Sequence, residues 1–491
     1  MWGVLPVLGL FFTQYSSGAL MLRQRDAPAV VTLDIQRNEV PDPVVRDQIR
    51  RKRDNTILQT IDNEETLYFC NVTIGTPEQS LRLIVDTGSS DLWCNAANST
   101  LCTSSNDPCR ISGSYDPNSS SSYAHVSSNF NISYADGTGA AGAYLTDILH
   151  IGGAVIRDFQ FGIGYTSSSA EGVLGIGYPS NEVQVARFGN KAYPNLPRSL
   201  VQNDQIQSSA YSLWLNDLEA NTGSILFGGV DSERFHGDLQ TLPVQSVDGG
   251  YSELIIVLTG IALSTESKTR ELTSNALPAA VLLDSGSSLT YLPDSIVESI
   301  YNDVGVTYEQ SAGAGYAPCS LAQENINITF TFSSPEIRVG ISELVIQSGD
   351  LRFWNGEQAC VFGIVPAGDS TAVLGDTFLR SAYVVYDLEN NEISLANTRF
   401  NSTTSNILEI GTGRGAVPNA TAVPNPITSV VADGSGARIG GPTGTNTVPS
   451  TSTGAAVVAL GGGIGLTRYI AVWAIAMGHM CFVGVEYLTL Y

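Results

Sequence analysis

The chain has 491 residues, a length typical of about two to four domains with substantial hydrophobic cores. It carries 24 lysine and arginine residues against 47 aspartate and glutamate residues, a formal net charge of −23 at pH 7. Nucleic-acid binding requires a basic face that neutralises phosphates, so this composition excludes that class of partner. The four histidines show no metal-ligand spacing, and we expect neither a metal site nor a bound cofactor.

The first 53 residues have the composition of targeting and processing segments. Residues 2–12 are apolar and residues 16–19 are small, which predicts a secretory signal peptide over residues 1–19, with a buried first helix as the alternative. Residues 20–53 are polar and end in the basic cluster RRKR. After a signal peptide such a cluster is typical of a processing site, so we predict a propeptide over residues 20–53, with a solvated linker as the alternative.

Between residues 60 and 400, short β-branched and aromatic runs alternate with turns rich in Gly, Asn, Ser and Asp. Few segments have a helical period, and we predict an all-β fold.

Seven cysteines in a secreted chain imply disulfides and one unpaired thiol, for which Cys481 in the apolar tail is the natural candidate. Of the other six, Cys102 and Cys109 close a short polar loop, and Cys319 and Cys360 are the only pair available in the second half of the chain. Cys70 and Cys94 lie in strand-like runs, and adjacent strands would bring them together. Sequence alone does not prove this connectivity, and we expect the disulfides Cys70–Cys94, Cys102–Cys109 and Cys319–Cys360.

The C-terminal part changes composition twice. Residues 401–454 are rich in Ser, Thr, Gly, Pro and Asn, which predicts a disordered, O-glycosylated stalk. Residues 455–491 are strongly apolar and fit either the removed tail of a GPI signal or a single transmembrane helix. Either anchor would tether the protein to a membrane at the cell surface. Seven sequons predict a secreted glycoprotein: Asn71, Asn98, Asn118, Asn131, Asn327, Asn401 and Asn419.

Two motifs occur twice in the same order. Residues 83–90, LIVDTGSS, recur as residues 281–288, VLLDSGSS, and residues 172–175, GVLG, recur as residues 372–375, AVLG. The aspartate precedes the last glycine of the second motif by 89 residues in the first copy and by 91 in the second. This repetition predicts two related lobes.

Asp86 and Asp284 follow three large apolar residues in their copies, so each carboxylate is carried at the end of a buried strand. A single such aspartate would be interpreted as a turn residue that caps backbone amides. If the two lobes pack about a pseudo-two-fold axis, both carboxylates meet at their interface. Two carboxylates at so short a distance share one proton. One of them can then act as a general base and the other as a general acid, beside one water.

With these motifs the chain resembles the pepsin-like aspartic proteases (family A1), and within them the fungal surface-tethered yapsin-type and secreted candidapepsin-like subgroup. The resemblance spans about residues 64–397 and implies a bilobal fold, with the active site in the cleft between residues 54–235 and residues 236–400. Ser285 departs from the family, which more often has Thr there, but the hydroxyl is retained. The resemblance rests on residues 68–77, 86–93 (DTGSSDLW), 133–138 (SYADGT), 284–293 and 374–380 (LGDTFLR).

The resemblance also implies roles for individual residues. Asp86 and Asp284 would activate a water that attacks a peptide carbonyl in acid. The hydroxyls at 87 and 285 would tie the two loops together, and those at 89 and 287 would bind the outer carboxylate oxygens. The loop residues that support the two aspartates are Thr87, Gly88, Ser89, Ser285, Gly286 and Ser287. A flap and its partner would close over the substrate: Tyr134, Asp136, Gly137, Thr138 and Trp93.

By the same resemblance, the partners are protein or peptide substrates and pepstatin-type inhibitors, and the protein is a monomer made as a zymogen for the fungal cell surface or wall. The alternative function is a non-catalytic, pepsin-fold module that binds the cell wall, since a fold does not dictate a function.

Overall fold

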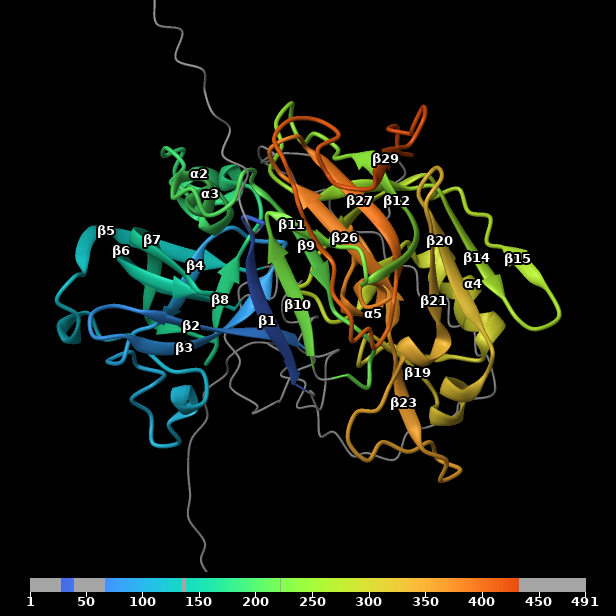
Figure 1. Ribbon diagram of the computed structural model, residues 1–491. Coiled ribbons are helices and arrows are strands. Elements are labelled where there is room, and N and C mark those ends of the chain that lie inside the picture. Colours follow the sequence, from blue (N-terminus) through green and yellow to red (C-terminus); the bar gives the residue numbers. More distant parts are fainter. Residues whose placement is uncertain (1–27, 39–66, 135–137, 221, 432–491) are drawn as a thin grey trace, which may run out of the picture.

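The computed structural model describes residues 28–38, 67–134, 138–220 and 222–431 (Figure 1). Strands make up most of its regular structure, which confirms the predicted all-β class. Several predicted segments lie outside these ranges: the signal peptide 1–19, the basic cluster 50–53, the flap residues Asp136 and Gly137, and the tail 455–491. Within the described ranges, no helix is both long and apolar enough to cross a bilayer.

One sheet of 14 strands runs through both lobes. In spatial order it contains β29 (Ala420–Ala422), β12 (Phe235–Pro243), β27 (Glu392–Thr398), β26 (Ala382–Asp387), β9 (Ala210–Trp214), β10 (Thr222–Phe227), β1 (Val31–Asn38), β2 (Leu67–Ile74), β3 (Gln79–Asp86), β8 (Gly172–Gly175), β4 (Leu92–Asn95), β7 (Ala154–Ser167), β6 (Gly139–Ile151) and β5 (Ala124–Ser133).

Smaller sheets complete the second lobe and its edges. They are formed by β13 (Ile255–Leu258), β16 (Ala279–Leu283), β25 (Ala372–Leu374), β17 (Thr290–Leu292) and β24 (Ile364–Pro366); by β15 (Thr269–Glu271), β14 (Gly260–Ser264), β20 (Asn327–Thr331) and β21 (Glu336–Gly340); by β18 (Thr307–Glu309), β19 (Ala314–Pro318), β23 (Ala359–Phe362) and β22 (Val345–Ile346); and by β11 (Gly229–Asp231) and β28 (Ile407–Glu409). Within the described residues the α-helices are α2 (Val183–Ala186), α3 (Leu196–Gln202), α4 (Asp294–Val304) and α5 (Asp376–Leu379). Short 3₁₀ turns occur at Pro108–Arg110, Pro117–Ser119, Pro179–Asn181, Cys319–Gln323 and Ile341–Glu343.

The duplicated motifs form the same strand arrangement twice. In the first copy, β3 runs parallel to β8, β8 antiparallel to β4, and β4 parallel to β7. In the second copy, β16 runs parallel to β25, β25 antiparallel to β17, and β17 parallel to β24. Side chains at equivalent positions also belong to corresponding small apolar clusters. They are Trp93 and Val173 in the first lobe and Tyr291 and Val373 in the second. The two related lobes predicted from the sequence are therefore confirmed.

The two lobes are joined by strands rather than by a simple linker. β9 from the first half and β26 from the second pair antiparallel, with Leu213 opposite Val384, and both side chains are buried. On either side of this seam, β10 and β1 continue the sheet in one direction, and β27 and β12 in the other (Figure 1). The orientation of the lobes is therefore fixed by backbone hydrogen bonds in a buried sheet.

β1 comes from the predicted propeptide 20–53 and yet lies inside this sheet. It pairs with β10 along residues 31–36 and with β2 along residues 36–38. Val31, Leu33 and Ile35 are at most 5% exposed. Their alternation along the strand, one residue in two, places all three on the same buried face. This segment is thus a core strand, which was not predicted from the sequence.

The prediction of a disordered stalk over residues 401–454 is wrong for residues 401–431, which we call the C-terminal strap. In the strap, β28 pairs with β11 and β29 pairs with β12. Ile410, Val417 and Val423 are at most 7% exposed, and Ser405 Oγ donates to Asp231 Oδ2 at 2.7 Å. The composition misled because a few well-spaced apolar residues and many backbone and hydroxyl hydrogen bonds suffice when a preformed surface is available.

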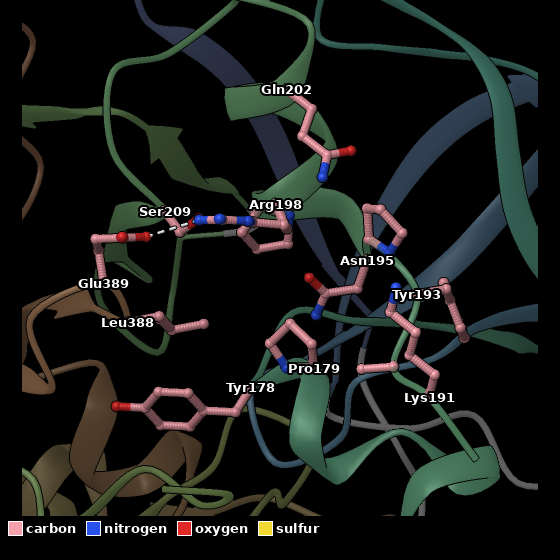
Figure 2. A pocket seen from close by; sticks show the side chains of 13 residues that line it. Tyr178, Pro179, Lys191, Tyr193, Asn195, Arg198, Gln202, Ser209, Leu388 and Glu389 are labelled. Carbon is pink, nitrogen blue, oxygen red and sulfur yellow. Dashed lines mark hydrogen bonds and ion pairs between the residues drawn. The ribbon is translucent and has the colours of Figure 1, made fainter.

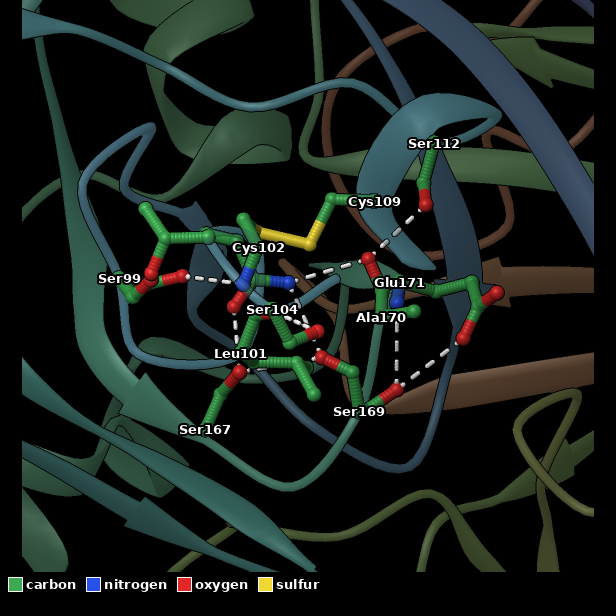
Figure 3. Close-up of a disulfide and its surroundings, with 12 residues drawn as sticks. Ser99, Leu101, Cys102, Ser104, Cys109, Ser112, Ser167, Ser169, Ala170 and Glu171 are labelled. Atoms are coloured by element: carbon green, nitrogen blue, oxygen red, sulfur yellow. Dashed lines mark hydrogen bonds between the residues drawn. A yellow bond between two sulfur atoms is a disulfide. The ribbon is translucent and has the colours of Figure 1, made fainter. Parts of the chain in front are cut away.

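Two of the predicted disulfides, Cys102–Cys109 and Cys319–Cys360, are confirmed, and the third is wrong. Figure 3 shows the small loop closed by Cys102–Cys109 beside residues 169–171. Cys70 and Cys94 are buried free thiols. They lie on β2 and β4, which are separated in the sheet by β3 and β8, so the assumption that their strands are adjacent fails.

Removal of the C-terminal strap tests its contribution to folding. A chain that ends at residue 400 should unfold at a lower temperature than one that ends at residue 431. The three buried apolar side chains of the strap each contribute about 1.5–3 kcal/mol when fully buried, so the free energy of unfolding should fall by several kcal/mol. Thermal unfolding followed by circular dichroism measures the difference. Equal unfolding temperatures would contradict a folded strap.

Candidate active site

Asp86 and Asp284 occupy matching places in the two lobes. Asp86 ends β3 opposite Gly175 of β8, and Asp284 follows β16, where its backbone N–H donates to Leu374 O of β25 at 3.1 Å. The apolar residues immediately before both aspartates are fully buried. Each strand therefore fixes the point at which its carboxylate emerges from the lobe core.

Each carboxylate accepts the same two local hydrogen bonds, one from the N–H two residues further on and one from the serine hydroxyl three residues further on. The distances are 2.8 and 2.6 Å at Asp86 and 2.8 and 2.7 Å at Asp284. The donors are Gly88, Ser89, Gly286 and Ser287. Both carboxylates are thus held in one orientation before any substrate binds.

Glycines allow the two loops to approach each other closely. A Cβ atom at Gly286 would lie 2.6 Å from Asp86 Oδ1 and 3.1 Å from Asp284 Oδ1, and one at Gly88 would lie 2.6 Å from Asp284 Oδ1. The two predicted carboxylates are therefore brought together, with Asp86 buried and Asp284 half-buried.

The loops are connected by crossed hydrogen bonds. Thr87 N donates to Ser285 Oγ at 3.2 Å, and Ser285 N donates to Thr87 Oγ1 at 3.0 Å. The two hydroxyls also donate, from Thr87 to Leu283 O at 2.9 Å and from Ser285 to Val85 O at 3.0 Å. Thr87 and Ser285 are almost completely buried, so water does not compete for these bonds.

The predicted flap lies between β5 and β6, which pair antiparallel up to Ser133 and Gly139. Tyr134 N donates to Thr138 O at 2.9 Å across the hairpin. The Tyr134 hydroxyl accepts a hydrogen bond of 2.6 Å from Trp93 Nε1, and the Tyr134 side chain packs against the apolar cluster around Trp93. Trp93 is fully buried, which makes it a rigid support for the flap.

Two tyrosines lie on the seam between the lobes. Tyr211 of β9 and Tyr386 of β26 are directly opposite each other and stack with their ring centroids 5.0 Å apart. Burial raises the pKa of both phenols, and the charge of Asp86 adds to the shift of Tyr211, as that of Asp284 does for Tyr386. Each of the two carboxylates therefore interacts electrostatically with a neutral tyrosine of the seam.

A set of contacts behind the first loop was not predicted from the sequence. Asn181 Nδ2 donates to Gly88 O at 3.2 Å, and Asp91 accepts hydrogen bonds from the hydroxyls of Tyr144 and Tyr193. Asp91 stands in the DTGSSDLW motif, so its position was visible. Its partners lie 53 and 102 residues further along the chain, and no pattern in the sequence marks them.

A pocket of about 390 Å³ lies elsewhere, between α3 and the turn after β26 (Figure 2). Pro179, Pro194 and Pro197 contribute to the walls of the pocket. Arg198 and Glu389, which also line it, form an ion pair of 2.8 Å. None of the predicted catalytic or flap residues lines this pocket.

Comparison with known proteins agrees with the geometry of the site. Residues 67–398 match the family model described as eukaryotic aspartyl protease. The chain belongs to this family. It is 69% identical to the probable aspartic-type endopeptidase opsB of Aspergillus oryzae, over 94% of this chain and 96% of that protein.

Two further relatives place the chain within the family. A probable aspartic-type endopeptidase opsB of Aspergillus fumigatus is 69% identical over 93% of this chain and 95% of its own. The aspartic proteinase yapsin-3 of Saccharomyces cerevisiae is 36% identical over 74% of this chain and 72% of its own. These relatives confirm the predicted aspartic protease family and support its yapsin-like subgroup.

The crossed hydrogen bonds predict a large effect of Thr87→Val. The substitution preserves the shape of the side chain but leaves the buried Leu283 carbonyl and Ser285 amide without their partner, at a cost of about 2–4 kcal/mol in the free energy of unfolding. Urea unfolding measures this loss, with Thr273→Val at an exposed position as the matched control. A T87V protein as stable as the control would show that these bonds do not hold the lobes.

Proposed function

We propose that the aspartic-type endopeptidase activity of this chain is carried by Asp86 and Asp284, which activate one water for attack on a peptide carbonyl. The observation that carries the proposal is the approach of two equivalent carboxylates, each oriented by the same pair of hydrogen bonds. The ionised carboxylate takes a proton from the water, and the protonated one donates a hydrogen bond to the carbonyl oxygen. The diol intermediate collapses when a proton passes to the leaving nitrogen.

The surrounding residues would keep this geometry constant during turnover. Ser89 and Ser287 hold the outer carboxylate oxygens, so each aspartate presents its other oxygen to the water. Thr87 and Ser285 fix the separation of the two loops. Reactive groups that are already oriented need no reorganisation when charge develops, which is the usual source of such catalysis.

The flap would close over the bound peptide. The hydrogen bond from Trp93 holds the Tyr134 hydroxyl, and the hairpin places Thr138 opposite Tyr134. In this position Tyr134 excludes bulk water from the carboxylates, while Asp136, Gly137 and Thr138 meet the substrate backbone.

The test is cleavage of an acid-denatured protein between pH 3 and pH 7, with and without pepstatin. Asp86→Asn and Asp284→Asn preserve the size of the side chain but remove the shared proton, and each should lower kcat by at least about 10³-fold. Asp238→Asn, at an exposed position, is the matched control and should leave kcat unchanged. Pepstatin should abolish cleavage by the wild-type protein.

Cleavage that persists in both active-site variants would contradict the proposed dyad. A protein that binds pepstatin and cell-wall material but cleaves nothing would instead favour the alternative, a non-catalytic wall-binding module.

We also propose that the protein is a secreted, monomeric glycoprotein that acts in acid. The two disulfides are typical of oxidising compartments. Of the seven sequon asparagines, six are exposed and Asn327 is half-buried. Protonation of carboxylates in acid would reduce the self-repulsion of a chain with a net charge of −23.

Activation and tethering are part of the same proposal. Cleavage at residues 50–53 would convert a zymogen into the active form, although β1 is hydrogen-bonded on both sides and would stay in the sheet until its strand pairs also separate. A GPI anchor or a transmembrane helix in residues 455–491 would tether the enzyme. Because the C-terminal strap is folded, the stalk would begin after residue 431 rather than at residue 401.

A further inference from the structure

Behind the loop that carries Asp86, two more carboxyl groups are buried together. Asp91 and Glu182 are both 0% exposed. Asp91 ends the loop that begins at Asp86, and Glu182 immediately precedes α2. In the described part of the chain, neither carboxyl group has a basic partner. Their charge is therefore not neutralised by a salt bridge, and burial of two ions at once would be very costly.

The two carboxyl groups differ in their hydrogen bonds. Asp91 Oδ1 accepts from the hydroxyls of Tyr144 at 3.0 Å and Tyr193 at 2.8 Å, and Asp91 Oδ2 accepts from Val183 N at 2.8 Å. Glu182 Oε2 accepts only from Tyr193 N, at 2.9 Å, and Glu182 Oε1 is buried without a partner. Three donors stabilise an ionised Asp91, whereas the surroundings of Glu182 suit a neutral acid.

The electrostatics agree with this assignment. Burial raises the pKa of both carboxyl groups, and the charge of Asp91 raises that of Glu182 further, to about 9. The other titratable groups that face the pair are the phenols of Tyr144 and Tyr193, whose pKa values burial also raises. Glu182 therefore keeps its proton in acid and at neutral pH.

The pair is bonded to the catalytic loop. Val183 N donates to Asp91, and Asn181 Nδ2 donates to Gly88 O, so residues 181–183 are attached to both ends of the segment 88–91. Beyond Asp91 the chain continues directly into β4 and Trp93, the support of the flap. A displacement of residues 181–183 would thus reach both the loop of Asp86 and the flap.

We propose that Asp91 and Glu182 are positioning residues, a second carboxyl pair that keeps residues 181–183 attached to the catalytic loop while Glu182 is protonated and releases them in base. This inference rests on the proposed function. When Glu182 loses its proton, two buried carboxylates repel each other, and relief requires residues 181–183 to move away. In the unfolded chain Glu182 ionises near its ordinary pKa of 4.5, so the folded state binds more protons above that pH, and stability falls as the pH rises towards about 9.

Glu182→Gln tests the proposal, because an amide is neutral at every pH. Wild type and E182Q are compared for Tm between pH 4 and pH 9, with each protein normalised to its own value at pH 4. The Tm of E182Q should fall less steeply with pH than that of the wild type. Glu298→Gln, at an exposed position on α4, should follow the wild type.

A Tm that falls with pH as steeply in E182Q as in the wild type would overturn the proposal. Asp91→Asn is a second variant that removes the neighbouring carboxyl group, and it should flatten the Tm profile in the same way. Failure of both variants to fold at pH 4 would show a role independent of the proton and would also overturn it. If the wild type cleaves no peptide, the Tm profiles still test the pair, so this failure is distinguishable from that of the proposed function.

Discussion

The crossed hydrogen bonds between Thr87 and Ser285 are the contact on which the rest of the site depends. They join two loops almost 200 positions apart, at a place that water does not reach. Each loop carries one carboxylate, so these bonds set the distance between Asp86 and Asp284. If the two carboxylates share one proton, as proposed, that distance must stay short. The proposed chemistry of the site therefore depends on how the two lobes are joined.

Other elements of the fold protect this junction. The seam between β9 and β26 holds the lobes in one orientation through backbone hydrogen bonds, and the glycines at 88 and 286 leave room for the opposite carboxylate. The C-terminal strap pairs with β11, whose sequence belongs to the first half, and with β12, from the second. The strands of both lobes thus maintain a constant relation between the two small loops.

Much of this could be predicted from the sequence, since the duplicated motifs fixed the position of both aspartates and of the strands before them. The failures share one cause, which is that local patterns do not contain the spatial order of strands. Cys70 and Cys94 lie on strands that two others separate, and β1 becomes a core strand only because β2 and β10 leave a place for it. The strap and the partners of Asp91 were missed for the same reason, since their stabilising contacts come from distant parts of the chain.

The most direct test of the central claim is a double-mutant cycle on kcat/KM with Asp86→Asn, Asp284→Asn and the combined variant, each confirmed to be folded by its Tm. If one proton and one water are shared by both carboxylates, either single substitution removes the whole function of the pair, and the double variant should be no less active than the weaker single variant. Losses that multiply in the double variant, or a single variant that keeps substantial activity, would show that the aspartates act independently and would contradict the account.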